Sequence, residues 1–296
     1  MLRKTLHTGF LVFLVCGTLQ SQSVEDILNQ KLQEETRPEY TLATFKAGRI
    51  INGHSAETTE KGDLLFIIGH RFGTLNSGFY NFFGLDDATT RLGLDYGITD
   101  RINAGIGRST YQKTWDGFMK YKILRQGTGP STYPITLTLV IGADLLTYKD
   151  PASEIKYTFV NRLSYVTQLL AARKFGPRFS LQLSPTFIHK NLVQRRIDQN
   201  NIFAMGSGAR FKLSNRVSLN AEYYYLLPGQ TATDYMNSFS LGVDLETGGH
   251  VFQLHLTNSR SMIERGFISE TSGNWLDEDI HFGFNITRNF GLQKYR

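Results

Sequence analysis

Apolar and polar residues alternate along most of the chain from Gly62 onward, which predicts β-strands with one apolar face and one polar face. In the clearest segment, residues 91–98, four apolar side chains alternate with charged residues or glycine. The same period recurs in other segments, many with the ~9–11 residues that a tilted strand needs to cross a membrane. The pattern therefore predicts about twelve strands of transmembrane length.

The connections between these segments alternate in length. Tight turns such as Thr99–Asp100 and Gly127–Pro130 alternate with longer polar loops such as Gly73–Thr90 and Asn258–Asp277. Short turns on one side and long loops on the other are typical of outer-membrane barrels, whose long loops lie outside the cell. With an even number of strands, the chain enters and leaves the barrel on the same side, so its N- and C-termini are both expected in the periplasm.

The fold predicted for residues 62–296 is therefore all-β, a closed antiparallel up-and-down transmembrane β-barrel. No stretch of the mature chain has the apolar length of a membrane helix, and only a closed barrel lets strands span a bilayer without free edges. A soluble β-sandwich also alternates apolar and polar residues. The alternation of turns and loops, together with an export signal, favours the barrel.

Residues 1–22 are predicted to be a secretory signal peptide. Arg3 and Lys4 precede the apolar run Phe10–Val15, which is too short to span a bilayer. Cleavage would remove Cys16, the only cysteine, so the mature chain would have no disulfide and no thiol chemistry. Residues 23–61 would follow as a plug in the lumen, an ordered periplasmic piece or a loose lead-in. Asn52-Gly53 is a turn signal within them.

Charge gives the lumen its predicted character. The formal net charge of +6 is mild and scattered along the chain, which argues against nucleic acid as a partner. Charged residues fall on the polar, inward faces of the strands, where they would form a narrow constriction and favour small anions modestly. The candidate constriction residues are Arg91, Asp95, Arg101, Lys120, Lys122, Asp144, Arg162, Arg210, Glu222 and Asp244.

Three inward acids, Asp95, Asp144 and Asp244, fit either paired acids or ion pairs with inward arginine and lysine, because a buried charge needs a partner. The inward His255 and His281 fit either a metal site or a polar network. The sequence has no HExxH, phosphate-loop or GxSxG motif. We therefore expect no metal, no cofactor and no enzymatic activity.

Several segments of the chain resemble a Bacteroidetes outer-membrane β-barrel family that is catalogued as a domain of unknown function. The resemblance is carried by TFKAGRIINGHSAE at Thr44–Glu57, HRFG at His70–Gly73, FFGLDDA at Phe82–Ala88, RLGLDYGITD at Arg91–Asp100, GIGRS at Gly105–Ser109 and DGFMKYK at Asp116–Lys122. It implies a barrel fold, an outer-membrane location and a Bacteroidetes source. It implies no catalytic residue.

Three hypotheses for function follow. The first is a narrow pore or transporter for small solutes. The second is a non-conducting structural or interaction barrel, whose partners would be outer-membrane lipid and other envelope proteins. The third is an outer-membrane hydrolase, which needs a Ser–His pair such as Ser77 with His70. The sequence favours the first two.

Overall fold

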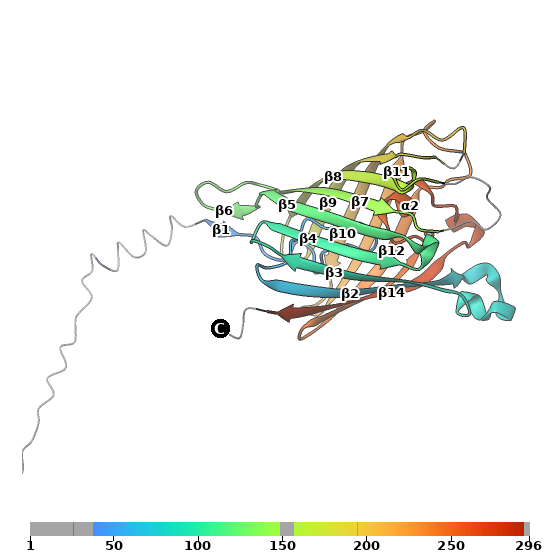
Figure 1. Ribbon diagram of the computed structural model, residues 1–296. Coiled ribbons are helices and arrows are strands. Elements are labelled where there is room, and N and C mark those ends of the chain that lie inside the picture. The colour runs from blue at the N-terminus through green and yellow to red at the C-terminus, as the bar shows by residue number, and fades with distance from the viewer. Residues whose placement is uncertain (1–25, 27–37, 149–156, 194, 293–296) are drawn as a thin grey trace, which may run out of the picture.

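The computed structural model describes Asp26 and residues 38–148, 157–193 and 195–292. Within them, twelve antiparallel strands form one closed barrel, in which each strand pairs with the next along the chain and the last closes on the first (Figure 1). This confirms the predicted fold class. The strands are β2 (Asp63–Thr74), β3 (Ala88–Gly97), β4 (Ile102–Ser109), β5 (Trp115–Leu124), β7 (Thr136–Leu145), β8 (Leu163–Lys174), β9 (Phe179–Lys190), β10 (Asn201–Lys212), β11 (Val217–Leu226), β12 (Ser238–Thr247), β13 (His250–Thr257) and β14 (His281–Gly291).

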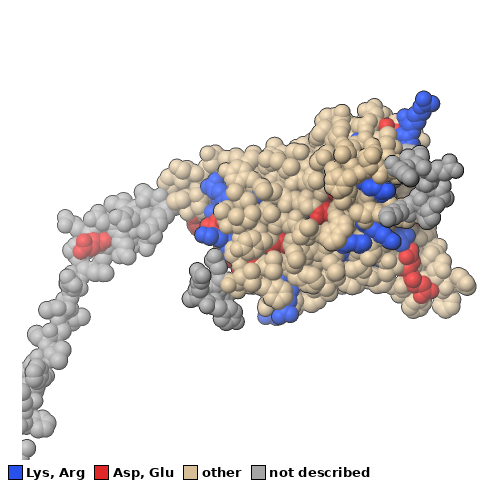
Figure 2. Space-filling model, in the orientation of Figure 1, with Lys and Arg blue, Asp and Glu red and all other residues tan. Residues whose placement is uncertain are grey.

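The alternation of side chains sorts each strand into a lumen face and an outer face. On β3, Arg91 and Asp95 are buried in the lumen, whereas Leu92 and Leu94 point outward and are exposed. Apolar residues such as Ile141, 55% exposed, form the outer surface. Figure 2 shows most Lys and Arg near the two ends of the barrel, with a band of mostly other residues between them. Such a band suits the hydrocarbon of a membrane.

The two ends of the barrel differ in their connections. The terminal end, where β14 ends and β1 (Glu39–Tyr40) lies, has short turns such as residues 98–101 (Figure 1). The opposite end, here called the loop end, has long connections such as residues 258–280. Residues 1–22, where the signal peptide is predicted, lie outside the described residues.

The β5–β7 connection departs from the predicted tight turn at Gly127–Pro130. It spans residues 125–135 and contains β6 (Gly127–Thr128), which pairs with β1. A Cβ on Gly127 would lie 2.5 Å from the Glu39 carbonyl oxygen, so only glycine allows the two strands this approach. A pairing between segments so far apart in the sequence leaves no signal in the local turn residues.

The lumen is filled by two segments that enter from opposite ends. The first, here called the lumen hairpin (residues 44–57), turns back at Asn52-Gly53, where the Ile50 N–H donates to the Gly53 carbonyl and Arg49 bridges to His54. Residues 44–57 thus turn at Asn52-Gly53 and lie inside the barrel, whereas residues 23–25 and 27–37 of the expected lead-in lie outside the described residues. The second, here called the inserted loop (residues 258–271), carries the short helix α2 (Glu264–Ser269), all of whose residues are buried.

No helix among the described residues is both long enough and apolar enough to cross a membrane.

Candidate functional site

The tip of the lumen hairpin is held by one carboxylate of the barrel wall. Glu222 on β11 accepts hydrogen bonds from the backbone N–H groups of Ile51, Asn52 and Gly53, at 3.2, 3.3 and 2.9 Å. Three consecutive N–H donors around an anion form a strong, charge-assisted contact. The Asn52 side chain also accepts from Arg71 Nη2 at 2.6 Å. The tip is therefore fixed both through its backbone and through the Asn52 side chain, and a sequence pattern does not reveal the backbone contacts.

The stems of the hairpin are held by a buried lysine. Lys120 on β5 is fully buried, and its ammonium donates to the carbonyl oxygens of Gly48, Ser55 and Glu57 at 2.7, 3.1 and 3.2 Å. These three acceptors use all three protons of the ammonium group. Lys120 thus joins the two arms of the hairpin to each other and to the wall.

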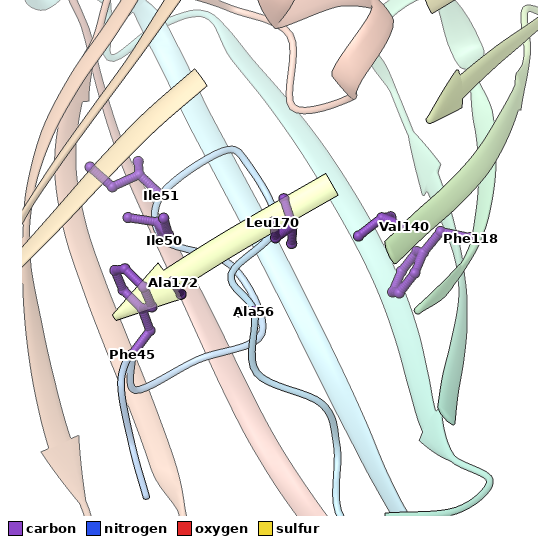
Figure 3. Packing of buried hydrophobic residues seen from close by; sticks show 8 residues of the cluster. All are labelled: Phe45, Ile50, Ile51, Ala56, Phe118, Val140, Leu170 and Ala172. Carbon is purple, nitrogen blue, oxygen red and sulfur yellow. The ribbon is translucent and has the colours of Figure 1, made fainter. Parts of the chain in front are cut away.

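Apolar contacts supplement these polar ones. Four hairpin side chains pack against four from the wall, and Figure 3 shows the hairpin residues lying toward the wall strands. The hairpin contributes Phe45, Ile50, Ile51 and Ala56, and the wall contributes Phe118, Val140, Leu170 and Ala172. A Cβ on Gly208 would lie 2.2 Å from Ile50 Cδ1, so this glycine on β10 leaves room for the hairpin.

The hairpin and the inserted loop meet inside the barrel. Glu264, at the start of α2, accepts a hydrogen bond from Arg49 Nη1 at 2.7 Å and lies 3.3 Å from His54 Nε2. All three side chains are buried. Because breaking a buried ion pair leaves an uncompensated charge, movement of either segment is energetically linked to the position of the other.

A second set of ion pairs fixes the inserted loop to the wall. Arg265 Nε donates to Asp144 on β7 at 2.9 Å, and its Nη1 donates to both Glu270 oxygens at 2.7 Å. Lys190, at the end of β9, also donates to Glu270 at 2.7 Å. The apolar residue Phe267 packs edge-on against Tyr224 of β11, with ring centroids 5.2 Å apart. The loop is therefore a packed part of the lumen.

The space left in the lumen is small. Cavities of about 20 Å³ and 10 Å³ remain between the hairpin, the inserted loop and the wall. Each has room for roughly one water molecule. A larger cavity of about 240 Å³, lined by Lys46, Glu57, Glu246 and His250 among others, lies at the terminal end. Among the described residues, the hairpin and the inserted loop thus occupy much of the lumen and leave small cavities between themselves and the wall.

The structure places the ten candidate constriction residues unequally. Arg101 is a correction: it lies exposed in the tight turn before β4, because the strand begins one residue later than the alternation indicated. Arg162 lies in the 3₁₀ helix η4 (Val160–Arg162) at the loop end, where it donates to the Leu146 and Tyr148 carbonyls. Lys122 lies 3.6 Å from Glu57 and is partly buried. The others, Arg91, Asp95, Lys120, Asp144, Arg210, Glu222 and Asp244, are buried in the lumen.

The inward acids have different partners. Asp144 pairs with Arg265, a residue that the alternation did not single out, and Asp244 accepts from Gln253 at 2.9 Å. Asp95 is buried, and no hydrogen bond from the described residues reaches its Oδ1. Arg91 pairs with Asp116 of β5. Of the two possibilities open from the sequence, the ion pair applies to Asp144, with a cation from the inserted loop.

The candidate metal and catalytic groups differ in their contacts. His281 contacts the Phe72 carbonyl oxygen at 2.8 Å through Nδ1, while both ring nitrogens of His255 lack hydrogen-bond partners among the described residues. In that part of the chain, no cluster of three or more His, Cys, Asp or Glu residues suits a metal ion. The His70 ring stacks on Phe284 at 4.9 Å, whereas the Ser77 hydroxyl donates to the Thr74 carbonyl. These contacts give no Ser–His pair.

The charged residues of the lumen hairpin and the inserted loop were missed by the sequence reasoning, because it searched the strands for inward charges. Arg49 and His54 belong to the lead-in, and Glu264, Arg265 and Glu270 belong to a loop that was expected to be polar and external. One available signal was apolar content: Met262, Ile263, Phe267 and Ile268 are out of place in a loop exposed to water.

The comparison with known families agrees with the barrel fold. A family model described as a membrane-bound β-barrel domain (DUF5777) matches residues 45–290. The chain matches no curated protein sequence. Among solved structures, the NanC porin is 11% identical with a TM-score of 0.48, and the match covers 77% of this chain and 98% of the porin.

Two further solved structures are similar at the same level. For Omp33 of Acinetobacter baumannii, the identity is 7%, the TM-score 0.43 and the coverage 78% of this chain and 99% of that one. Outer membrane phospholipase A of Escherichia coli is 11% identical with a TM-score of 0.42, and the match covers 76% of this chain and 92% of that one. At such scores the similarities carry no argument about a solute or a reaction.

Proposed function

Because the chain belongs to this family of membrane-bound β-barrel domains, we propose that it is an outer-membrane barrel with a gated lumen, closed in the state described. The observation that carries the proposal is the meeting of the lumen hairpin and the inserted loop at Glu264, which closes the barrel from both ends. Opening a narrow pathway for small solutes then requires the hairpin to leave toward the terminal end.

The outer membrane is supported by the closed barrel and by the export signal expected over residues 1–22. A closed barrel whose outer band is apolar is the form in which strands cross that membrane. Short turns at the terminal end and long loops at the other are the periplasmic and external sides of such barrels. We therefore place the terminal end, and with it residues 38–43, in the periplasm.

The polar character of the hairpin contacts favours a gate. Lys120, Glu222, Gln182 and Gln253 hold the hairpin mainly through its backbone groups. Water can replace such hydrogen bonds when the hairpin leaves, so each contributes only about 0.5–1.5 kcal/mol net, or up to ~3 kcal/mol where a charge takes part. The polar part of this interface can therefore be released at a small net cost in free energy.

A second function, a permanently closed structural or interaction barrel, is favoured by the apolar cluster in Figure 3. Phe45, Ile50 and Ile51 are each at most 3% exposed, and withdrawing them would cost about 1.5–3 kcal/mol per side chain. The two functions differ in whether the folded barrel conducts once the hairpin is removed.

Single-channel conductance in planar bilayers separates the two. We expect the intact protein to be silent or rarely open, and a variant lacking residues 44–57 to show discrete openings. Glu264→Gln should raise the open probability at least tenfold, because it weakens a buried contact whose loss costs about 3–5 kcal/mol. The matched control is Glu278→Gln, an exposed position between the inserted loop and β14.

Folding is checked by heat-modifiable migration on gels before each recording. Silence from a folded barrel without its hairpin would exclude the gate and favour the structural barrel. Open channels in the intact protein with unchanged behaviour of Glu264→Gln would also contradict the proposal, because the lumen would then not be closed by these contacts.

A further inference from the structure

The loop between β2 and β3 exposes aromatic side chains to an unusual degree. Residues 75–85 read LNSGFYNFFGL and contain no charged side chain. Phe79 and Tyr80 are 80% and 94% exposed, and Phe82, Phe83 and Leu85 are exposed as well. Exposed apolar groups gathered in one place mark a binding surface more often than isolated ones do. We refer to Phe79, Tyr80, Phe82 and Phe83 as the aromatic tip.

The backbone holds the aromatic tip in a defined shape. Phe82 and Phe83 adopt φ values of 45° and 53°, the left-handed region that bulky residues rarely enter. Gly84 folds the loop against the end of β2, where a Cβ on it would lie 2.5 Å from the Gly73 backbone. The Phe83 N–H donates to the Gly78 carbonyl. The left-handed conformation costs ~1–2 kcal/mol per residue. The surrounding loop must offset this cost, so the exposed position of these rings is a specific feature of the fold.

The loop continues the apolar outer surface of the barrel. Beneath it on the outer face, Phe72 of β2 stacks on Phe282 of β14, with ring centroids 5.8 Å apart. From Phe290 to Phe282, β14 rises roughly 20 Å along the membrane normal, assuming ~3.4 Å per residue and a tilt of about 40°. The apolar band of such barrels is ~25 Å tall. The loop therefore begins where the hydrocarbon ends and the headgroups start.

Two exposed aspartates, Asp86 and Asp87, directly follow the loop. Asp87 pairs with Arg260, which belongs to the inserted loop. Asn76 donates to Asp279, in the connection that leads to β14. Figure 1 shows the loop, with its 3₁₀ helices, beyond the ends of β2 and β3 at the end opposite the C-terminus. Asn76 and Asp87 are thus tied to neighbouring connections, whereas the four aromatic side chains of the tip are exposed.

We propose that the aromatic tip is a membrane anchor, which inserts into the boundary between headgroups and acyl chains of the leaflet at the loop end. Aromatic rings with one polar atom, such as Tyr80, favour this boundary because the ring is apolar and the hydroxyl stays hydrated. The occupant is lipid, because the tip is continuous with the lipid-facing band and carries no charge for a polar partner. The anchor fixes the height of this side of the barrel independently of the lumen.

Depth-dependent fluorescence quenching tests the anchor. The only cysteine of the sequence is Cys16, within the predicted signal peptide, so Tyr80→Cys provides a single labelling site in the mature chain. The refolded, bimane-labelled protein is placed in phosphatidylcholine vesicles with or without brominated acyl chains. Ile141→Cys, on the outer face, is the lipid control, and Glu278→Cys, exposed at the loop end, is the water control.

We expect the Tyr80 label to lose at least half as much fluorescence to brominated lipid as the Ile141 label, and to resist aqueous iodide. The Glu278 label should be quenched by iodide and should lose little fluorescence to brominated lipid. Iodide quenching at Tyr80 equal to that at Glu278 would overturn the anchor. Shielding from both quenchers would also overturn it, because a second copy of the chain would then cover the tip. Only protein that shows heat-modifiable migration is compared.

Discussion

At the scale of single residues, the closed lumen depends on glycines that let the hairpin approach the wall. A Cβ on Gly53, at the hairpin tip, would lie 2.1 Å from the Tyr224 hydroxyl oxygen and 3.0 Å from Cζ of that ring. Tyr224 is buried against Phe267 of the inserted loop and has little room to move away. One added methyl group at this position therefore acts on the hairpin and the inserted loop together.

We predict that Gly53→Ala loosens the hairpin. Overpacking of this kind costs about 1–3 kcal/mol, so the open probability in bilayers should rise roughly tenfold. Adding Tyr224→Phe, which removes the nearest atom, should restore part of the closure. Gly176→Ala is the control, because a Cβ there meets nothing within 4 Å. An unchanged open probability in Gly53→Ala would show that the tip is not held as tightly as the contacts indicate.

At the scale of elements, the hairpin and the inserted loop respond to pH in different ranges. Burial, and then the positive charge of Arg49, lowers the pKa of His54 well below its ordinary value of 6.5, so His54 is neutral in the closed lumen. Glu264 lies 3.3 Å from the same ring but already has Arg49 as its cation. Burial opposes charge on Glu270, yet Arg265 and Lys190 outweigh it and lower its pKa below 4.5.

The sign of the pH effect follows from these directions. A released hairpin returns His54 to its ordinary pKa, so the released state binds more protons below about pH 6.5 and the closed state loses stability as pH falls below that value. The contribution of Glu270 is lost only below its ordinary value of 4.5, as pH falls toward its lowered pKa. Release of the hairpin should thus begin well before the inserted loop is affected.

We predict that trypsin cleavage after Arg49, a buried site in the closed state, becomes faster between pH 7.5 and 5.5 relative to cleavage of an exposed site. Peptide mass spectrometry measures both cleavages in one sample, which corrects for the pH dependence of the protease. His54→Asn should remove most of this acceleration. If the variant keeps the same pH dependence as the original protein, His54 does not control release of the hairpin.

The wall of this barrel could be predicted from the sequence, whereas its filling could not. Alternation along β3 and β11 assigns Arg91 and Glu222 to the lumen because side chains alternate across a strand. The Asn52-Gly53 turn was also visible, since its residues adopt the needed backbone locally. What alternation does not carry is a contact such as Arg49 with Glu264, between residues 215 positions apart and outside the strands.

At the scale of the whole molecule, closure of the barrel wall does not depend on the segments that fill its lumen. Closure rests on the β14–β2 ladder, which runs from His281 paired with Thr74 to Gly291 paired with Asp63. The hairpin takes no part in that ladder. Without β14, strands β13 and β2 would each expose an edge to lipid, where every unpaired backbone group costs several kcal/mol. Without the hairpin, no edge appears.

We therefore predict opposite outcomes for two deletions of comparable size. A chain lacking residues 44–57 should still insert into lipid vesicles and keep heat-modifiable migration, whereas a chain lacking residues 281–291 should do neither. Co-flotation with vesicles and gel migration measure the two properties. Failure of the hairpin deletion to insert would mean that the hairpin is needed for the barrel to form. The inward charges of the wall, Lys120 and Glu222 among them, would then require their hairpin partners before the strands can close.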